Sequence, residues 1–336
     1  MFNNELYGQL KVYTTRYKTK SVMQLINSVL PYLLIVALMS WLLLHGFSYL
    51  IVLPLAVIAA GFMIRIFIVF HDCVHDSFSA SRLVCSIVGH FCGIITFTAF
   101  YPWQRSHILH HMSTSNLQKR GVGDVWMMTL QEYNDSSFIK KIIYRLYRNP
   151  FFLFVMVPVF KFFILNRIPE SYKLNRFLFS QLITTAGIVL MAVAASFTIG
   201  FTNYLLIQVP IMAIGGGAGI WLFYIQHQFE NSYWTNNSDW DPLKASMQGA
   251  SYYKLPGLLR WFTGNIGFHH IHHLLPNIPN YNLKKCYNEV EDVRHVNIIT
   301  LWKSFRAMAL KLYDEKTQKL ISFRKSRQIN KITHNA

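Results

Sequence analysis

Two pairs of long apolar segments constrain this chain more than any other feature. Residues 25–44 and 49–70 carry almost no charge and are joined by a short turn, and residues 177–201 and 204–224 repeat that arrangement. About 20 apolar residues in a helix cross the roughly 30 Å hydrocarbon core of a bilayer, where helices satisfy their own backbone hydrogen bonds. The sequence therefore predicts an all-α integral membrane protein with four transmembrane helices in two hairpins.

Two shorter apolar segments leave the number of spans open. Residues 85–100 are short for a span, so we expect a re-entrant or buried hairpin that returns the chain to the side it came from. Residues 151–165 are interrupted by Pro158 and Lys161, which favours an interfacial or partly inserted helix. If both segments cross fully, the protein has six spans.

The composition and the charge distribution agree with a membrane protein. The chain is 52% hydrophobic and only 14% charged, and its formal net charge is +17. Of the 32 Lys and Arg residues, 4 lie in residues 1–23, 12 in residues 71–176 and 15 in residues 228–336. The remaining one is Arg65, and the turns inside the hairpins have none. By the positive-inside rule, we expect a multi-pass cell-membrane protein with both termini cytoplasmic. The charge follows the membrane topology, which argues against nucleic acid as a partner.

These segments predict one domain, residues 1–336, without a cleavable signal peptide. Its expected parts are a cytoplasmic N-terminal segment (1–23), a first transmembrane hairpin (25–70), a cytoplasmic region (71–176), a second hairpin (177–226) and a mostly helical cytoplasmic region (227–336). In the second hairpin the run IGGGAG, residues 214–219, indicates close approach of a neighbouring helix or of a ligand.

Histidines recur in three clusters beside the apolar segments. The first cluster reads HDCVH, the second HILHH and the third HHIHH, and the last two share the spacing H-x-x-H-H; the members are His71 and His75, His107, His110 and His111, and His269, His272 and His273. In a helix, positions i, i+3 and i+4 share one face, so each cluster directs its rings into one small volume. His227 follows the fourth span at the same expected depth, and we expect it to be a ninth member.

The clusters predict a site with two metal ions. Imidazole-rich sites suit iron, copper, nickel or zinc, and eight or nine nitrogens exceed the four to six positions of one ion. The zinc-protease motif H-E-x-x-H is absent, and a structural zinc site would close with four ligands. An oxygen-activating pair of iron ions fits best, because an iron centre with neutral nitrogen ligands can be oxidised by O₂.

Several other polar residues are candidates for supporting roles. Asp72, Asp76, Asp124 and Asn265 are candidates to accept the second ring N–H of a ligating histidine, and His270 is expected just outside the metal ligands. Arg65, inside the second span, either reaches the interface or faces a polar interior, where it would support the metal ligands or position the substrate. The four histidines far from the clusters are expected to be structural: His45, His90, His295 and His334.

The three clusters resemble the histidine boxes of the integral-membrane fatty acid desaturases. The stretches WLFYIQHQFE, TGNIGFHHIHHLLPNIPNYNL and YRLYRNPF are similar to the acyl-lipid desaturases of bacteria, cyanobacteria and plastids, including the phospholipid Δ5 desaturase of Bacillus. The resemblance covers most of the chain.

This resemblance implies a reaction and a set of ligands. The clusters at His71, His107 and His269 match the first, second and third boxes of the family, and His227 matches an extra ligand near the fourth span. The family uses two irons and O₂ to introduce a cis double bond into acyl chains, here those of membrane phospholipids. A fused cytochrome b5 motif, H-P-G-G, is absent, so a separate ferredoxin or flavodoxin would supply electrons. Related acyl-CoA desaturases have an Asn ligand where this chain has Phe223, so no ligand is expected there.

Two other functions share parts of this pattern. A membrane hydroxylase, ketolase or alkane monooxygenase would use the same boxes and differ only in the fate of the substrate radical. A metal transporter or sensor could also cluster histidines, but a transporter places ionisable ligands near the middle of the bilayer. The clusters here lie beyond the ends of the apolar segments, which favours the enzyme.

Overall fold

The computed structural model describes residues 4–121 and 123–334, and most of them are helical. In chain order the helices and strands are α1 (Asn4–Lys11), η1 (Val12–Thr14), α2 (Lys18–Leu44), α3 (Tyr49–Val74), α4 (Arg82–Ile95), α5 (Phe100–Ser113), β1 (Met128–Thr129), α6 (Leu130–Asp135), α7 (Phe138–Tyr147), η2 (Phe152–Met156), α8 (Val157–Phe163), η3 (Leu165–Arg167), α9 (Arg176–Thr198), α10 (Phe201–His227), η4 (Asn237–Asp239), α11 (Pro242–Met247), β2 (Tyr252–Lys254), α12 (Gly257–Phe262), α13 (His269–Leu274), α14 (Asn280–Glu289), η5 (Asp292–Arg294), β3 (Ile298–Thr300), α15 (Leu301–Ala307), β4 (Leu310–Asp314), β5 (Lys319–Ser322) and α16 (Phe323–His334).

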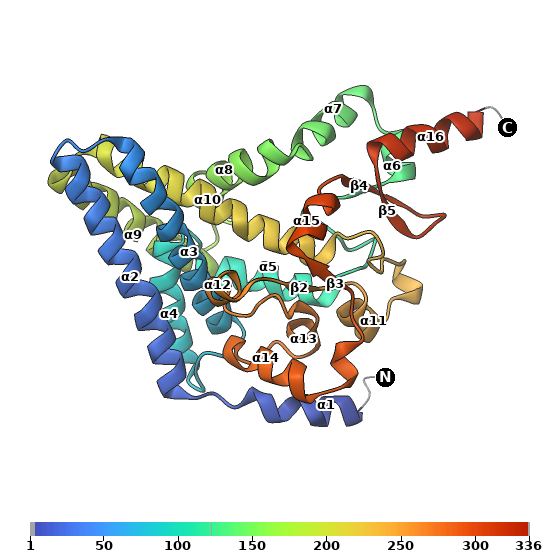
Figure 1. Ribbon diagram of the computed structural model, residues 1–336, viewed down its shortest axis with the longest axis horizontal. Helices are drawn as coiled ribbons and strands as arrows, with labels where there is room; N and C mark the ends of the chain where they lie inside the picture. The colour runs from blue at the N-terminus through green and yellow to red at the C-terminus, as the bar shows by residue number, and fades with distance from the viewer. Residues whose placement is uncertain (1–3, 122, 335–336) are drawn as a thin grey trace.

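Two helical hairpins, α2–α3 and α9–α10, form the arm on the left of Figure 1. All four helices are long and apolar enough to cross a membrane. The side chain of Ser48 caps the start of α3, and that of Asn175 caps α9. Gly200, at φ +84°, makes the turn before α10, a conformation that costs other residues steric strain. The predicted class, an all-α protein with two hairpins of spans, is confirmed.

The shorter apolar segments fold as bent pairs of helices. Most of residues 85–100, expected as a hairpin, form the single helix α4, which meets α5 at 100°, and α5 carries the second histidine box. α7 meets residues 152–167 at 64°. Pro158 is the second residue of α8, which continues directly from the π-helical η2. Counting each bent pair as one span gives six.

The glycine run in α10 is a packing surface, as the sequence predicted. A Cβ at Gly217 would collide with the carbonyl oxygen of Phe154 in η2, and a Cβ at Gly216 would lie 2.8 Å from the ring of Phe162 in α8. On the side of α10 that faces α3, a Cβ at Gly215 would collide with the side chain of Met63. The small residues therefore let α10 pack closely between α3 and the η2–α8 segment.

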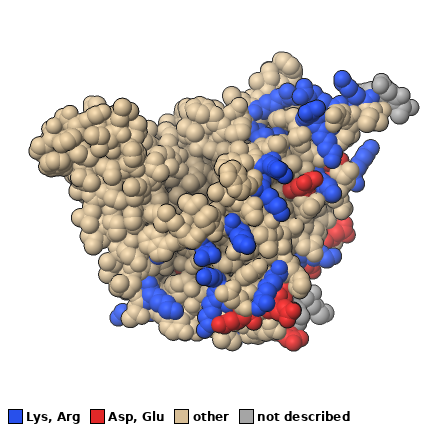
Figure 2. Space-filling view, viewed as in Figure 1, with Lys and Arg blue, Asp and Glu red and all other residues tan. Residues whose placement is uncertain are grey.

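The remaining segments form a cap at one end of the hairpins, on the right of Figure 1. It contains two small sheets, with strand orders β1-β4-β5 and β2-β3, which the sequence did not predict because strands of two to five residues have no readable period. β2 has a role in the site: Tyr253 donates its backbone N–H to the oxygen of Gly267, 2.8 Å away, immediately before the third box. In the view of Figure 2, Lys and Arg side chains lie over the cap and the lower end of the hairpins, and the upper left part of the arm shows none.

Candidate metal centre

The three histidine boxes and His227 meet at the junction of the hairpins and the cap. His71 lies in the last turn of α3, and His75 ends that helix. The second box lies in the last two turns of α5, the third opens α13, and His227 is the last residue of α10. Four helices from distant parts of the chain thus bring nine imidazoles together.

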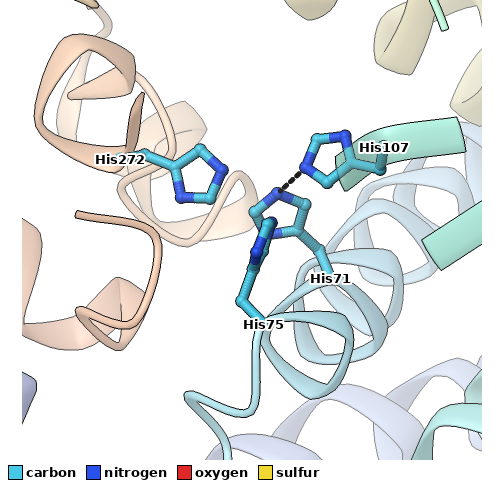
Figure 3. A group of neighbouring side chains, drawn as sticks. All are labelled: His71, His75, His107 and His272. Carbon is cyan, nitrogen blue, oxygen red and sulfur yellow. Dashed lines mark hydrogen bonds between the residues drawn. The ribbon is translucent and has the colours of Figure 1, made fainter. Parts of the chain in front are cut away.

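The rings separate into two groups of four, each able to hold a metal ion. The first group is His71, His75, His107 and His272, and the second is His110, His227, His269 and His273. Within each group the ligand nitrogens all lie within 4.8 Å of one another. Figure 3 shows the first group, with rings from all three boxes directed toward a common centre.

His111 joins the first group by contact. Its Nε2 atom lies 3.1 Å from Nε2 of His107 and 3.0 Å from Nε2 of His272. Nε2 of His107 in turn lies 3.0 Å from Nε2 of His71. His111 also stacks on His273, with ring centroids 4.2 Å apart, and so connects the two groups. All nine histidines predicted from the sequence are present in the cluster.

The second group shows the same convergence. Nε2 of His227 lies 3.1 Å from Nε2 of His110 and 2.9 Å from Nε2 of His269, and His269 lies 3.1 Å from His273. Nitrogens bound to one ion at about 2.1 Å and at right angles are about 3 Å apart. The observed separations match that spacing.

The protonation of two rings shows that this arrangement suits a cation. His110 donates its Nδ1–H to Asp124 (2.8 Å), and His227 donates its Nδ1–H to the oxygen of Gly249 (3.3 Å). In the neutral form that binds a metal, an imidazole has one N–H; with that N–H at Nδ1 in both rings, the two Nε2 atoms carry lone pairs and face each other at 3.1 Å. Two lone pairs repel at this distance unless a cation lies between them. In addition, Nε2 of His75 is buried without a hydrogen-bond partner in the described chain. The residues therefore fit a metal.

The buried environment keeps the third box neutral. Burial, reinforced by neighbouring imidazoles, lowers the pKa of His269, His272 and His273 well below the usual value. Neutral imidazole is the form that binds a metal. Burial also lowers the pKa of His270 to about 3. Nε2 of His270 hydrogen-bonds the oxygen of Val293 at 2.9 Å and so anchors α13 to η5. The sequence placed His270 just outside the metal ligands; in the structure its hydrogen bond is to η5 and not to a ligand.

Of the four residues proposed to orient the ligands, one makes a hydrogen bond to a ligand. Asp124 accepts from His110, as described. Asp72 lies 3.8 Å from Nδ1 of His71, too far for a hydrogen bond. Asp76 pairs instead with Arg82 (3.4 Å), and Asn265 donates to the backbone oxygen of Asn280 (3.3 Å). Adjacency in sequence was no guide: Asp72 and Asp76 directly follow a box histidine and make no such bond, whereas Asp124 lies 13 residues after His111.

Sequence reasoning missed a buried arginine that supports the second group. Arg148 is fully buried and donates to the side chain of Gln228 (2.7 Å) and to the oxygen of Trp126 (2.9 Å). Gln228 in turn donates to the oxygen of Val125 at 2.8 Å. This network ties the residue after His227 to the segment that carries Asp124. The only sequence signal was the position of Gln228 next to His227.

Aromatic side chains cover the cluster on two sides. Trp103 stacks on His107, with centroids 4.3 Å apart, and contacts His71 at 5.9 Å. Phe223 lies against His110 and His227, at 4.7 and 5.1 Å, so the position occupied by Asn in acyl-CoA desaturases does face the cluster. An apolar ring offers no ligand there, as expected.

The remaining candidates lie away from the cluster. Arg65 is buried: it donates to the backbone oxygen of Trp261 and lies over that indole at 3.9 Å, so it faces the protein and not lipid. His45 hydrogen-bonds the oxygen of Trp41, and His90 that of Ser86. His295 is exposed. The side chain of His334 lies outside the described residues.

Comparison with known proteins identifies the class that this fold and cluster define. Residues 47–304 match the model of the fatty acid desaturase family. The chain therefore belongs to the fatty acid desaturases, a family of oxidoreductases.

Individual relatives agree. The chain is 41% identical to a fatty acid desaturase of Bacillus subtilis (strain 168), over 97% of this chain and 92% of that protein. It is 26% identical to an sn-1 acyl-lipid omega-3 desaturase (ferredoxin) of Nostoc sp. (strain 36), over 71% of this chain and 68% of the relative. An sn-1 oleoyl-lipid 12-desaturase of Picosynechococcus is 24% identical, over 72% of this chain and 69% of the relative.

Proposed function

We propose that this enzyme uses two iron ions and O₂ to introduce a cis double bond, at Δ5, into saturated acyl chains of membrane phospholipids. The observation that carries the proposal is the division of nine imidazoles into two converging groups, with unprotonated nitrogens of His110 and His227 facing each other. The Bacillus relative supports the reaction class, and the acyl-lipid names of the cyanobacterial relatives support the substrate class.

The nine histidines are the metal ligands in this proposal. Iron would supply the oxidation of two adjacent methylenes, with O₂ reduced to water as two protons and two further electrons arrive. Burial keeps the rings of the third box neutral, and hydrogen bonds to Asp124 and Gly249 fix the rings of His110 and His227. Trp103 and Phe223 exclude water on the sides that they cover.

In this proposal the acyl chain approaches the first group past Trp103. A cavity of about 270 Å³ lies between α5, α9 and the segment before α9. Trp103, which contacts both His71 and His107, lines it together with Leu165, Ile168 and Phe177, and charged side chains, among them Arg105 and Glu170, line it as well. A flexible chain offers little directional binding, so the fixed shape of this route would set the position of the double bond.

The proposal also covers the location of the enzyme and its electron donor. The chain acts as a single domain, residues 1–336, in the cell membrane, with the termini and the cluster on the cytoplasmic side, as the distribution of Lys and Arg supports. The electron donor is a ferredoxin or flavodoxin. The donor named for the Nostoc relative is ferredoxin, and a net charge of +17 attracts an acidic partner.

The test is the fatty acid profile of cells that lack desaturases. Cells expressing the intact chain should accumulate a monounsaturated acid, and cells expressing His272→Ala should not. Gas chromatography–mass spectrometry of derivatised acids would identify the product and locate its double bond. His295→Ala is the matched control, because that histidine is exposed and outside the cluster.

Each outcome has a clear meaning. A double bond at another position would overturn Δ5 and leave desaturation intact. A hydroxylated or keto acid would replace the proposal with a monooxygenase. No product after co-expression of a ferredoxin, a flavodoxin and their reductase would count against the enzyme, and full activity in His272→Ala would overturn the ligand assignment.

A further inference from the structure

A second cavity, of about 440 Å³, lies on another side of α3, where α2, α12 and α14 meet. Its lining includes four cationic side chains, which come from these four helices: Lys20, Arg65, Arg260 and Lys284. No Asp or Glu is among its lining residues. No carboxylate of the described chain forms an ion pair with any of the four. The cavity is therefore a concentration of uncompensated positive charge.

The four cations are held in different ways. Arg65 is buried and fixed by Asn27, the backbone oxygen of Trp261 and the face of that indole. Lys20 and Lys284 are exposed, and Arg260 is half-buried. One immobile guanidinium at the wall and three accessible cations around it form a site for an anion with several oxygens.

The residues around the opening of this cavity are of the kinds found where a protein meets the membrane–water interface. Lys20 lies in the first turn of α2, at the polar end of that span. α12 packs on α3 through Phe62, yet it leaves Trp261 40% exposed and Leu258 69% exposed. Met23 of α2 is 59% exposed as well. A tryptophan and leucines beside cations are typical of a helix at the headgroup level of a bilayer.

The floor of the cavity belongs to the protein interior. Asn280 donates its side-chain amide to Asp72 (2.8 Å) and to Gln24 (3.1 Å), and its backbone N–H to Asp72 (3.1 Å). The Asp72 carboxylate is thus hydrogen-bonded to Asn280, and Asp72 is not among the residues that line the cavity. No histidine lines the cavity either.

We infer that this cavity binds the phosphate of an anionic membrane phospholipid, at a site distinct from the acyl-chain route beside Trp103. The cations bind the phosphodiester, and the exposed apolar side chains of α2 and α12 contact the acyl chains of the same lipid. A net anionic lipid is favoured over a zwitterionic one because no carboxylate is present to receive a headgroup ammonium. Basic pockets between transmembrane helices bind anionic headgroups in this way.

The test measures binding and does not depend on turnover. The iron-loaded protein in non-ionic detergent is titrated with dioleoyl phosphatidylglycerol, and retained lipid is counted by native mass spectrometry. We expect one lipid to bind saturably, about tenfold or more tighter than phosphatidylcholine of the same chains. The variant Arg260→Gln/Lys284→Gln should weaken that binding about tenfold or more.

A second double variant tests whether the lipid binds in the cavity or is attracted to the basic surface in general. Lys303→Gln/Lys325→Gln removes the same charge from two exposed lysines outside the cavity, and binding should stay within about twofold of the unaltered protein. Equal iron content in all three proteins would show that the fold is intact. Competition with inorganic phosphate and with dioleoylglycerol separates the contributions of phosphate and chains, and neither alone should displace the lipid at millimolar concentration.

Three results would overturn the inference. The first is equal affinity for phosphatidylglycerol and phosphatidylcholine. The second is equal weakening by the two double variants, which would show diffuse attraction to the basic surface. The third is tight binding of inorganic phosphate with full displacement of lipid, which would make this a site for a soluble anion.

Discussion

Each of the two histidine groups offers four ligand nitrogens, but the protein holds the rings of the two groups in different ways. In the second group, Asp124 and the oxygen of Gly249 fix the rings of His110 and His227 by hydrogen bonds. In the first group, Nδ1 of His71 has no partner in the described chain, like Nδ1 of His269 in the second group, and the His71 ring packs beside Trp103. A hydrogen bond sets the tautomer and basicity of a ligand, whereas ring packing sets only its position. The second group should therefore hold its metal more tightly.

The boxes contribute to the groups by a common rule. In each H-x-x-H-H box, the histidines at i and i+4 enter one group and the histidine at i+3 enters the other. His107 and His111 belong with the first group, and His269 and His273 with the second. The crossing residues are His110 and His272. The groups are thus interlocked, and losing one ligand from either should disable the whole reaction while leaving one metal in place.

The largest expected effect comes from removing one ligand of each group. His75→Ala and His227→Ala should each lower desaturation ~10³-fold or more, because both metals act on one substrate. Iron should fall from two to about one per chain in each variant, counted by plasma emission spectrometry. His295→Ala should keep both ions. Two firmly bound irons in either variant would disprove the assignment of that residue.

A smaller effect should follow from loosening the second group alone. Asp124→Ala removes the acceptor from His110 and should weaken one metal about 10- to 100-fold, the usual effect of losing such a partner. Asp124→Asn keeps an acceptor oxygen and should recover part of that loss. Dialysis against graded chelator, followed by iron analysis, measures both.

Asp76→Ala is the control for this comparison. Asp76 directly follows His75 in sequence, but its carboxylate pairs with Arg82. Metal retention should therefore be unchanged. In the unaltered protein, the first group should release its iron at lower chelator concentration than the second; the reverse order would refute the comparison between the groups.

The sequence was sufficient for the spans and for the members of the cluster, because hydropathy and helical spacing are local properties. It could not divide the cluster into groups: the spacing of His107 and His110 indicates a shared helical face, yet they belong to different groups. That division depends on which helix lies opposite. The same holds for Arg148, whose partners are up to 162 residues away, and for the paired strands β2 and β3, which are only three residues long and over forty residues apart.

The smallest expected effect concerns α10, the helix that supplies His227 to the second group. Gly217→Ala places a Cβ against the carbonyl oxygen of Phe154 and should cost about 1–3 kcal/mol of overpacking, partly offset by up to about 1 kcal/mol of helix propensity. Gly219→Ala meets no atom within 4 Å and should be neutral or slightly stabilising. Thermal unfolding in detergent measures both. Since His227 is the only cluster residue on α10, any iron lost from Gly217→Ala should come from the second group; loss from the first group would show that the two groups are not supported separately.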